Sequence, residues 1–325
     1  MRARAALWWR LTRPFTLLPP LLGVVSGAIT AWGSASEPHV LAGAPRSLTA
    51  SMVLTVVLGS ACAALLNAAS NVINQVYDLE NDRINKPDRP LVTGAVGLRE
   101  AWWLSVALYA AAVLPTWLVV AWPAETLREK LFAPLAAHQC FFIFLLGMVF
   151  TFVYSAPAFG RTKADAFLAN LTIAIPRGGL LKVAGWSMIA SALHVEPWFI
   201  GGIFFLFLVG ASSTKDFSDM AGDEAAGCRT LPVRFGVERA ARMIAPFFVL
   251  PWLLLPIGAW TSILTGNRWV LTGLGVLLAA WGGFTVRLIL RDPADLARVE
   301  NHPSWTHMYL MMMTAQVGFA VAYLI

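Results

Sequence analysis

The chain has 325 residues, of which 58% are hydrophobic and only 13% are charged, and its formal net charge is +6. Soluble domains usually carry about 25% charged residues, so this composition excludes an ordinary soluble globular protein. The three cysteines are widely separated and form no CxxC pair, and the five histidines have no zinc-ligand spacing. The composition therefore predicts a membrane protein without a disulfide framework or a structural zinc site.

About nine apolar windows are long enough to cross a bilayer, which requires roughly 20 mostly apolar residues per helix. These runs are continuous and do not alternate at a period of two, which excludes a transmembrane β-barrel. We therefore expect an all-α integral membrane protein in which residues 1–325 form one transmembrane domain. The predicted spans cover about 14–33, 51–74, 101–122, 138–158, 166–192, 197–214, 243–264, 269–290 and 305–325.

Basic residues are concentrated on one side of these predicted spans. With an odd number of spans, the N-terminus and the loops after the second, fourth, sixth and eighth spans share one side. Most of the 24 lysines and arginines fall there, whereas the opposite loops carry Arg46, Arg128, Lys130 and Arg268. The positive-inside rule then places the N-terminus and those even loops in the cytoplasm, in a plasma or inner membrane. This bias accounts for the net charge, so we expect no nucleic-acid partner.

The end of the second span carries a row of amide and carboxylate side chains. Asn67, Asn71, Asn74, Asp78 and Asp82 recur at intervals of three or four residues, so on a continuous helix they share one face. Polar groups at membrane depth are costly to bury and are usually functional. We call Asn74–Asp82 the first acidic motif.

A second cluster follows the sixth span. Asp216, Asp219 and Asp223 would share one face of a helix of the same geometry. Asp219 lies 141 positions after Asp78, and Asp223 lies 141 positions after Asp82. We call this cluster the second acidic motif, and its matched offset indicates an internal repeat.

The repeat predicts two pseudo-repeated halves, about 10–135 and 136–290, followed by a last helix. Internal repeats often place a shared site at their interface. Both acidic motifs lie on the predicted cytoplasmic side, with the N-terminus. We therefore expect the two motifs to converge on one site.

Carboxylates that converge in this way repel one another unless a cation balances them. Carboxylate and amide oxygens suit Mg²⁺, which commonly bridges protein carboxylates to substrate phosphates. Basic side chains nearby would hold a diphosphate, and together with the metal they would stabilise the negative charge on it as it departs. The expected metal ligands are Asn74, Asp78, Asp82, Asp219, Asp223 and, as a weaker candidate, Asp216. The expected catalytic residues are the aspartates Asp78, Asp82, Asp219 and Asp223. The expected diphosphate contacts are Lys86, Arg89, Lys163, Lys215 and Arg177.

A diphosphate site at the membrane surface, opening into a helix bundle, suits a lipid-tailed donor such as a prenyl diphosphate. The motifs also resemble the signatures of the UbiA superfamily of intramembrane prenyltransferases, with matches from about residue 10 to 240. The matching residues are Asn74, Asp78, Asp82, Asn85, Pro87, Pro90 and Gly94 in the first signature, Asp219, Asp223, Gly227, Arg229, Leu231, Pro232 and Gly236 in the second, and Tyr154, Ser155, Pro157, Arg161 and Lys163 in a third. This resemblance implies nine helices around a central cavity and Mg²⁺-dependent transfer of a prenyl group.

The residue after Asn74 favours one kind of acceptor. Many family members have Asp there, whereas this chain has Gln75, as homogentisate-type members do, and Lys215 before Asp216 fits the same type. The resemblance therefore implies an aromatic acceptor and a role in quinone biosynthesis. The run 230–233 also fits naphthoate-type members. Tetrapyrrole and glycerophosphate-ether members share much of the first loop, so a non-aromatic or tetrapyrrole lipid precursor stays as an alternative.

Several other polar residues are candidates for the substrate pocket. Arg177 lies within the apolar length of the fifth span, and we expect it to face the diphosphate or an acidic acceptor. Tyr154 would stabilise an allylic cation or anchor its helix at the interface, and Arg13 would face the acceptor or anchor the first helix. Asn71 shares the face of the first acidic motif, and Lys182 would snorkel towards the interface or serve function.

Other functions remain open on the sequence alone. A terpene cyclase on the same scaffold would ionise a prenyl diphosphate without using an acceptor. A polytopic transporter for a phosphorylated or cationic solute would use the same charged loops and release no diphosphate. The acids and bases could also form a solvated loop network, but the matched offset and the shared helix faces favour a site.

Overall fold

The computed structural model describes residues 2–36, 48–121, 124 and 126–325. Within these residues the regular secondary structure is helical, apart from an isolated parallel bridge between Asp165 and Arg229. This confirms the predicted all-α class. Arg46, one of the basic residues that bear on the predicted orientation, lies outside the described residues.

The predicted spans correspond to long helical segments, several of which join consecutive α-, 3-10 and π-helical pieces. Within the described residues, seven segments are long and apolar enough to cross a membrane. They are η1–α2 (Pro14–Leu17, Leu18–Gly33), α4 (Ala50–Tyr77), α6–η2 (Leu98–Val113, Leu114–Leu118), α9–η6–α10 (Ala166–Ala174, Ile175–Leu180, Leu181–Trp186), α11–η7 (Val195–Ala211, Ser212–Lys215), α14–η8–η9–α15 (Val237–Ile244, Ala245–Phe248, Leu250–Leu253, Leu254–Trp260) and α16 (Arg268–Arg291). The shorter apolar helix α8 (Gln139–Ser155) and the long helix α18 (Pro303–Leu324) stand where the other two spans were predicted.

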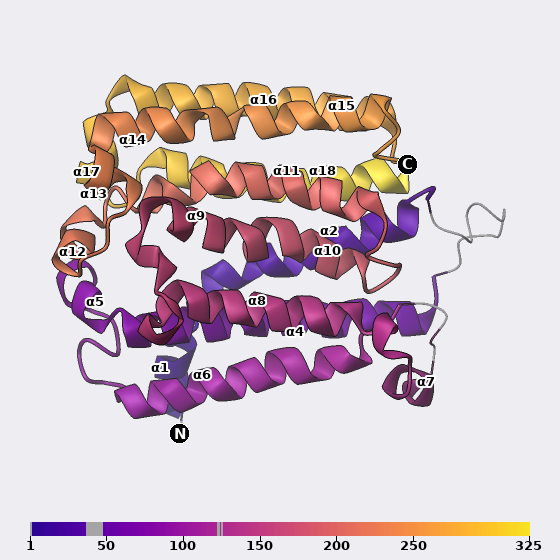
Figure 1. Ribbon diagram of the computed structural model, residues 1–325, viewed down its shortest axis with the longest axis horizontal. Helices are drawn as coiled ribbons and strands as arrows, with labels where there is room; N and C mark the ends of the chain where they lie inside the picture. Colours follow the sequence, from indigo (N-terminus) through magenta and orange to yellow (C-terminus); the bar gives the residue numbers. More distant parts are fainter. Residues whose placement is uncertain (1, 37–47, 122–123, 125) are drawn as a thin grey trace.

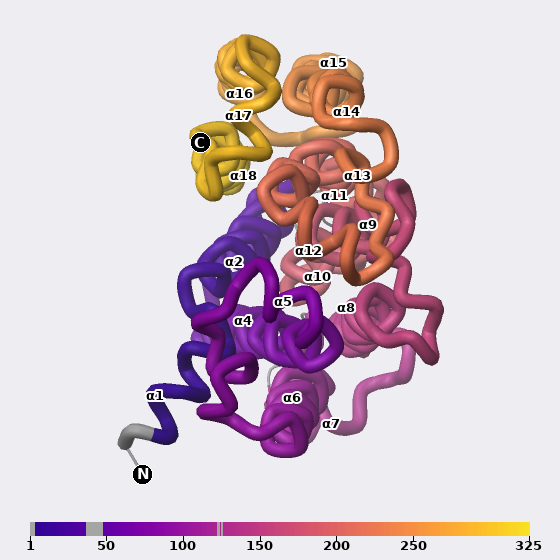
Figure 2. Tube along the Cα trace, turned by 90° about the vertical axis from the view of Figure 1, so that its left-hand side faces the viewer, coloured from indigo at the N-terminus to yellow at the C-terminus, as the bar shows by residue number. Residues whose placement is uncertain are grey.

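The remaining helices are short and gather at the two ends of the bundle. Figure 1 shows α5, α12, α13 and α17 together at the left-hand end, whereas α7 lies at the lower right, at the opposite end of the bundle. Seen from the left-hand end, α5 and α12 lie next to each other (Figure 2). The bounds of all these short helices are α1 (Arg2–Leu11), α5 (Leu79–Asn85), α7 (Leu127–Leu131), η3 (Leu135–Ala137), η4 (Pro157–Phe159), η5 (Thr162–Ala164), α12 (Met220–Ala225), α13 (Leu231–Phe235) and α17 (Pro293–Arg298). Both acidic motifs therefore lie at the same end, which we call the acidic end.

Local sequence sets several helix boundaries. Pro14 and Pro19 stand in the first turns of η1 and α2, where an intrahelical N–H is not needed, so they begin the first span and do not break it. Asp165 starts α9 by accepting hydrogen bonds from the N–H groups of Phe167 and Leu168, both at 3.0 Å. Pro176 lies inside the π-helical turn η6, where its missing N–H disturbs the regular ladder.

Glycines allow two of the helices to touch backbone to backbone. A Cβ at Gly27 of α2 would lie 2.7 Å from the carbonyl oxygen of Lys182 and 3.0 Å from the Cα of Gly185 in α10. Neither helix could approach so closely with a larger residue at the crossing. Small residues at such crossings are typical of membrane helix pairs, which associate through close packing.

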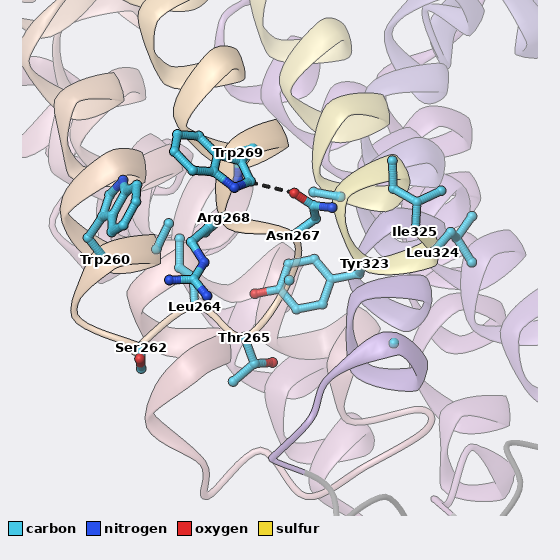
Figure 3. A pocket seen from close by; sticks show the side chains of 14 residues that line it. Trp260, Ser262, Leu264, Thr265, Asn267, Arg268, Trp269, Tyr323, Leu324 and Ile325 are labelled. Atoms are coloured by element: carbon cyan, nitrogen blue, oxygen red, sulfur yellow. Dashed lines mark hydrogen bonds between the residues drawn. The ribbon is translucent and has the colours of Figure 1, made fainter.

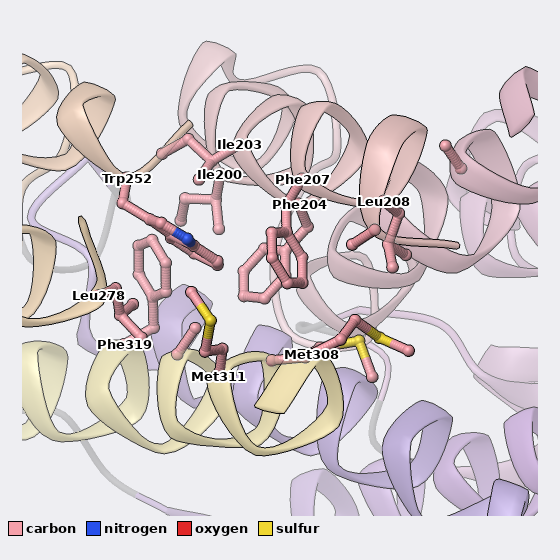
Figure 4. Close-up of a cluster of buried hydrophobic side chains, with 14 of the residues drawn as sticks. Ile200, Ile203, Phe204, Phe207, Leu208, Trp252, Leu278, Met308, Met311 and Phe319 are labelled. Carbon is pink, nitrogen blue, oxygen red and sulfur yellow. The ribbon is translucent and has the colours of Figure 1, made fainter. Parts of the chain in front are cut away.

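The centre of the bundle between α11, η9 and α18 is filled by aromatic side chains (Figure 4). Phe204 and Phe207 of α11 pack against Trp252, with ring centroids 6.0 and 4.9 Å apart, and Phe204 also meets Phe319 at 5.8 Å. All four side chains are buried. This region is therefore a packed aromatic core that holds the second half of the chain together.

A buried carboxylate joins the helices at the end opposite the acidic motifs. Glu196, at the start of α11, accepts hydrogen bonds from Ser34 Oγ at 2.6 Å, from the N–H of Thr265 at 2.6 Å and from the hydroxyl of Tyr323. These partners come from the end of α2, the loop before α16 and the end of α18. Because the carboxylate has several donors, its burial is compensated and it ties three elements together.

Candidate active site

The first acidic motif is bent at its central aspartate. α4 ends at Asp78, whose backbone (φ −102°, ψ 12°) leaves the helical region, and α5 begins at the next residue. The N–H of Asp82 still bonds to the carbonyl oxygen of Asp78 at 2.8 Å, so the two carboxylates stay one turn apart. Asn74 Oδ1 accepts from Ser155 Oγ at 3.0 Å. The prediction of one continuous helix through this motif is therefore wrong.

The second acidic motif is bent in the same way. η7 ends before Asp216, and Asp219 (φ −100°, ψ 4°) precedes α12. The N–H of Asp223 bonds to the carbonyl oxygen of Asp219 at 3.0 Å, as in the first motif. A single helix through these aspartates was also a wrong prediction, because a turn separates Asp216 from α12. The two motifs share a local conformation, whereas the division of the whole chain into two halves stays a prediction.

Asparagine side chains join the two motifs. Asn81 Nδ2 donates to Asp223 Oδ1 at 2.7 Å, and Asn85 Nδ2 donates to the carbonyl oxygen of Asp219 at 3.0 Å. The N–H of Gly222 donates to Asn85 Oδ1 at 3.2 Å. Each bond links α5 to α12, so we call Asn81, Asn85 and Gly222 the asparagine clasp. The clasp fixes the carboxylates of both motifs relative to each other.

Basic side chains balance the carboxylates at this end. Lys163 forms an ion pair with Asp78 Oδ1, and Arg161 Nη2 lies 3.9 Å from the same oxygen. Asp82 forms an ion pair with Arg89. A hydrogen bond of 2.9 Å from the N–H of Arg229 to the carbonyl oxygen of Ala164 ties the loop before α9 to the loop after α12, and so holds Lys163 beside the motifs.

Burial makes the charged forms of three carboxylates unfavourable. It raises the pKa of Asp223 to about 6, with a further contribution from the charge of Asp219. Burial also raises the pKa of Asp216 well above its usual value, and it raises the pKa of Asp82 although Arg89 opposes it. These directions describe the metal-free protein, and a bound cation would reverse them. Burial, more than repulsion between the acids, therefore opposes ionisation of these three carboxylates.

The amides that precede the first motif hold the N-terminal segment in place. Asn71 Nδ2 donates to the carbonyl oxygen of Thr12 at 2.8 Å, and Gln75 Nε2 donates to that of Leu11, also at 2.8 Å. Both amides are buried. In this structure their hydrogen-bonding groups contact the backbone of residues 11–12, so they position the segment that carries Arg13.

Three predicted pocket residues approach the acidic motifs from other elements. The guanidinium of Arg13 lies within electrostatic reach of Asp82, Asp219 and Arg177. The hydroxyl of Tyr154 lies within reach of Asp216, Asp223 and Arg177. Within the described residues neither Arg13 nor Arg177 has an ion-pair partner.

Two of the three described non-glycine residues with positive φ lie in this region, and the third, Ser262, lines a cavity at the opposite end. Arg13 (φ 51°) and Arg161 (φ 42°) both adopt the left-handed conformation, which costs about 1–3 kcal/mol for a residue other than glycine. Such strain persists where the surrounding contacts fix it, and it is concentrated at functional sites. Here it directs two arginines towards the acidic motifs.

Lys86 and Lys215 have a partner that the sequence did not reveal. Lys86 Nζ lies 3.5 Å from Asp219 Oδ1 and 2.6 Å from Glu300 Oε1. Lys215 Nζ donates to the backbone carbonyl oxygen of Glu300 at 2.7 Å. Glu300 lies in the turn between α17 and α18, far along the chain from both motifs, and no spacing pattern points to it.

The sequence reasoning also missed the structural role of Asn81. It named Asn85 only as part of the first signature and predicted no contact for that side chain. The signal was present, because Asn81 and Asn85 are four residues apart within α5 and so lie on one side of it.

Lys182 does not snorkel as one prediction had it. It is 2% exposed, its Nζ donates to Ser26 Oγ at 2.6 Å, and it lies 5.3 Å from the ring centroids of both Phe204 and Phe319. The side chain stays within the bundle between α2, α11 and α18.

A separate cavity of about 740 Å³ lies at the opposite end of the bundle (Figure 3). Its lining includes Trp260, Arg268, Trp269 and Tyr323, and it contains none of the predicted site residues. Asn267 starts α16 there by accepting from the N–H of Trp269 at 3.1 Å. The predicted chemistry belongs to the acidic end.

The fold and the two acidic motifs define a polytopic membrane enzyme of the prenyltransferase class. The model of the UbiA prenyltransferase family matches residues 26–313, and the chain belongs to this family. The fold of a UbiA homolog from Archaeoglobus fulgidus, solved with GPP and Mg²⁺ bound, is similar with a TM-score of 0.70 over 98% of this chain and all of that chain, at 22% identity. The chain is thus a multi-pass integral membrane prenyltransferase.

Two sequence relatives within the family carry the same name. A digeranylgeranylglyceryl phosphate synthase of Thermococcus kodakarensis is 31% identical over 77% of this chain and 76% of its own length. An enzyme of the same name from Methanoculleus marisnigri is 28% identical over 85% of this chain and 86% of its own length. The names of these relatives give no support to quinone biosynthesis. The aromatic acceptor was inferred from Gln75, whose side chain faces the N-terminal segment.

Proposed function

We propose that this protein transfers a prenyl group from a prenyl diphosphate to the hydroxyl of a glyceryl phosphate lipid. In the reaction the hydroxyl oxygen forms an ether bond to C1 of the prenyl chain, the bond from C1 to the diphosphate oxygen breaks, and the hydroxyl proton is released. The names of the relatives support the acceptor, and the paired acidic motifs support the donor. This acceptor replaces the aromatic one that the sequence favoured.

We infer that the acidic motifs hold Mg²⁺ together with the diphosphate. The donor types suit the ion, because carboxylate and amide oxygens are hard ligands and because Asp78 Oδ1 forms ion pairs but accepts no hydrogen bond within the described residues. As they lie, no three acidic side chains of the described residues stand close enough to hold a metal, so the ligands would have to draw together when the ion binds. When bound, the ion would balance the charge of the diphosphate. The proposed ligands are Asn74, Asp78, Asp82, Asp219 and Asp223, with Asp216 as a weaker candidate.

The basic residues have complementary roles in this proposal. Lys163, Arg89 and Lys86 now pair with carboxylates of the motifs, and those carboxylates would turn to the metal when the donor binds. The freed ammonium and guanidinium groups would then contact the diphosphate oxygens. Together with Lys215 they would stabilise the negative charge that develops on the leaving diphosphate.

Arg13 and Arg177 are the observation that carries the choice of acceptor. Both lie near the acidic motifs, and neither pairs with a carboxylate in the described part of the chain. An acceptor phosphate would supply the missing negative charge, and arginine binds phosphate well through its planar donors. Tyr154 lies within electrostatic reach of Arg177, and in this proposal its ring would face the prenyl carbon. Asn71 would act by positioning the segment that carries Arg13.

The proposed orientation places the acidic end in the cytoplasm. It rests on the excess of lysine and arginine at that end of the bundle. A water-soluble magnesium ion and a diphosphate headgroup would reach the motifs from that side, while the prenyl chain stays in the bilayer.

Purified protein in detergent with Mg²⁺ and geranylgeranyl diphosphate tests the function. The acceptors would be the monogeranylgeranyl ether of glyceryl phosphate, the same ether without its phosphate, and homogentisate, with products followed by mass spectrometry. We expect an ether product from the phosphorylated acceptor and at least tenfold less from the other two. A prenylated aromatic product would restore the first prediction, and a cyclic hydrocarbon formed without any acceptor would establish a cyclase. Absence of diphosphate release with every acceptor would contradict prenyl transfer.

A further inference from the structure

The turn between α17 and α18 reaches into the proposed donor site. Its Glu300 carboxylate binds Lys86 at 2.6 Å, and its backbone carbonyl oxygen accepts from Lys215 at 2.7 Å. Lys86 also lies 3.5 Å from Asp219. One residue outside both acidic motifs therefore holds two of the lysines assigned to the diphosphate.

Charge favours this arrangement while the donor is absent. The hydrogen bond from Lys86 and the charges of Lys86 and Lys215 lower the pKa of Glu300, so its carboxylate is ionised at neutral pH. Lys86 bonds the anionic carboxylate, whereas Lys215 bonds the neutral peptide carbonyl oxygen, so Lys86 is the lysine at which a diphosphate oxygen would replace the Glu300 carboxylate. Glu300 thus supplies the same chemistry, anionic oxygen, at the same lysine.

The turn that carries Glu300 is exposed and lies between two well-packed residues. Val299, Glu300 and Asn301 are all exposed, and 63% of the Glu300 side chain is accessible to solvent. The residues on either side are fixed, because Leu296 is buried in α17 and the buried His302 caps α18. The Glu300 carboxylate can therefore leave Lys86 without exposing a buried side chain, and it stays hydrated in either position.

We propose that Glu300 is a built-in competitor for the diphosphate, holding Lys86 until a prenyl diphosphate displaces it. The inference rests on the proposed function, because it assigns Lys86 to the donor site. It has two consequences. Donor affinity is lower than the basic cluster alone would give, and release of the product diphosphate is assisted when the carboxylate returns to Lys86.

Binding of inorganic diphosphate with Mg²⁺ to the full chain in detergent, measured by calorimetry, tests this inference. The variants are Glu300→Gln and Glu300→Ala, which remove the competing charge. The matched control is Glu80→Gln, which removes the same charge at the same end, from a side chain that pairs with Arg83 at 2.8 Å and is 75% exposed. The Glu300 substitutions would also be made in a Lys86→Met background, in which the Glu300 carboxylate has lost its ammonium partner.

We expect both Glu300 variants to lower the Kd for diphosphate by about two- to fivefold, the range of a partly exposed ion pair, and Glu80→Gln to change it by less than about 1.5-fold. The gain should shrink at high salt and disappear in the Lys86→Met background. An unchanged or higher Kd in Glu300→Gln would overturn the inference, as would an equal gain in Glu80→Gln.

The two proposals fail in different ways. If the wild-type protein forms the ether product but Glu300→Gln leaves the Kd unchanged, the competitor is refuted and the proposed function stands. If the wild-type protein binds no diphosphate in the presence of Mg²⁺ and forms no product, the proposed function fails, and the competitor with it.

Discussion

Replacing Gly222 with alanine tests whether the asparagine clasp positions the donor site. An added Cβ would lie 2.5 Å from Asn85 Cγ and 2.6 Å from Asn81 Oδ1, closer than real Cβ contacts allow. The Asn85 side chain would have to move away. It would then lose its hydrogen bonds with Asp219 and with the N–H of Gly222.

The size of the effect follows from those two bonds. A typical intramolecular hydrogen bond contributes about 0.5–1.5 kcal/mol net, so the loss of two amounts to about 1–3 kcal/mol. If the clasp serves to bring the two motifs together, that loss falls on the bound state. The Kd for the donor in the presence of Mg²⁺ should then rise about 5- to 150-fold.

The assay is titration of the donor at fixed Mg²⁺, with thermal unfolding of each variant measured alongside. The matched control is Gly273→Ala in α16, where an added Cβ meets nothing within 4 Å and a helical glycine gives way to a better helix former. This control should keep wild-type affinity. Wild-type affinity in Gly222→Ala would refute a positioning role for the clasp, and so would an equal loss in both variants.

Three further substitutions separate binding from stability. In steady-state kinetics, Arg177→Ala should raise the KM of the phosphorylated acceptor at least about tenfold and leave the donor KM unchanged, because it removes a hydrogen bond to a charged group. An equal rise in both KM values would contradict the assignment of Arg177 to the acceptor. Lys182→Met removes a buried ammonium that has Ser26 as its hydrogen-bond partner, so the Tm should not fall, and a drop of more than about 4 °C would contradict this. Glu196→Ala leaves the buried hydroxyl of Tyr323 without its acceptor and should lower the Tm with no change in Mg²⁺ dependence, whereas an unchanged Tm would refute its bridging role.

Apolar length was enough to predict the spans, because bilayer thickness sets that length. The same reasoning could not find the interruptions within a span. The π-helical turn that contains Pro176 and Arg177 depends on how η6 packs against α11, and apolar length carries no signal for it. The bends at Asp78 and Asp219 were missed because an ideal helix was assumed through each motif, whereas the chain turns there to bring α5 against α12.

The candidate site, like the fold, could be predicted only in part from the sequence. Matched spacing predicted that the two motifs lie together, and α5 and α12 are indeed joined by hydrogen bonds. Which carboxylates meet at a metal stays a prediction, because within the described residues no three acidic side chains stand close enough to hold one. The aromatic acceptor was inferred from Gln75, whereas the names of two relatives favour a glyceryl phosphate acceptor. The amide of Gln75 bonds the backbone of Leu11, so in this structure it positions the N-terminal segment. Glu300 could not be predicted at all, because its contact with Lys86 joins segments 214 residues apart and depends on where α18 packs.

A double-mutant cycle on donor affinity tests most directly the claim that the two acidic motifs form one site. The Kd for geranylgeranyl diphosphate in the presence of Mg²⁺ would be measured in the wild type, Asp78→Asn, Asp219→Asn and the double variant. We predict a coupling free energy above about 1 kcal/mol, because each aspartate would lose most of its effect once the other is neutralised. Strictly additive losses would contradict a shared site and show that the motifs act independently.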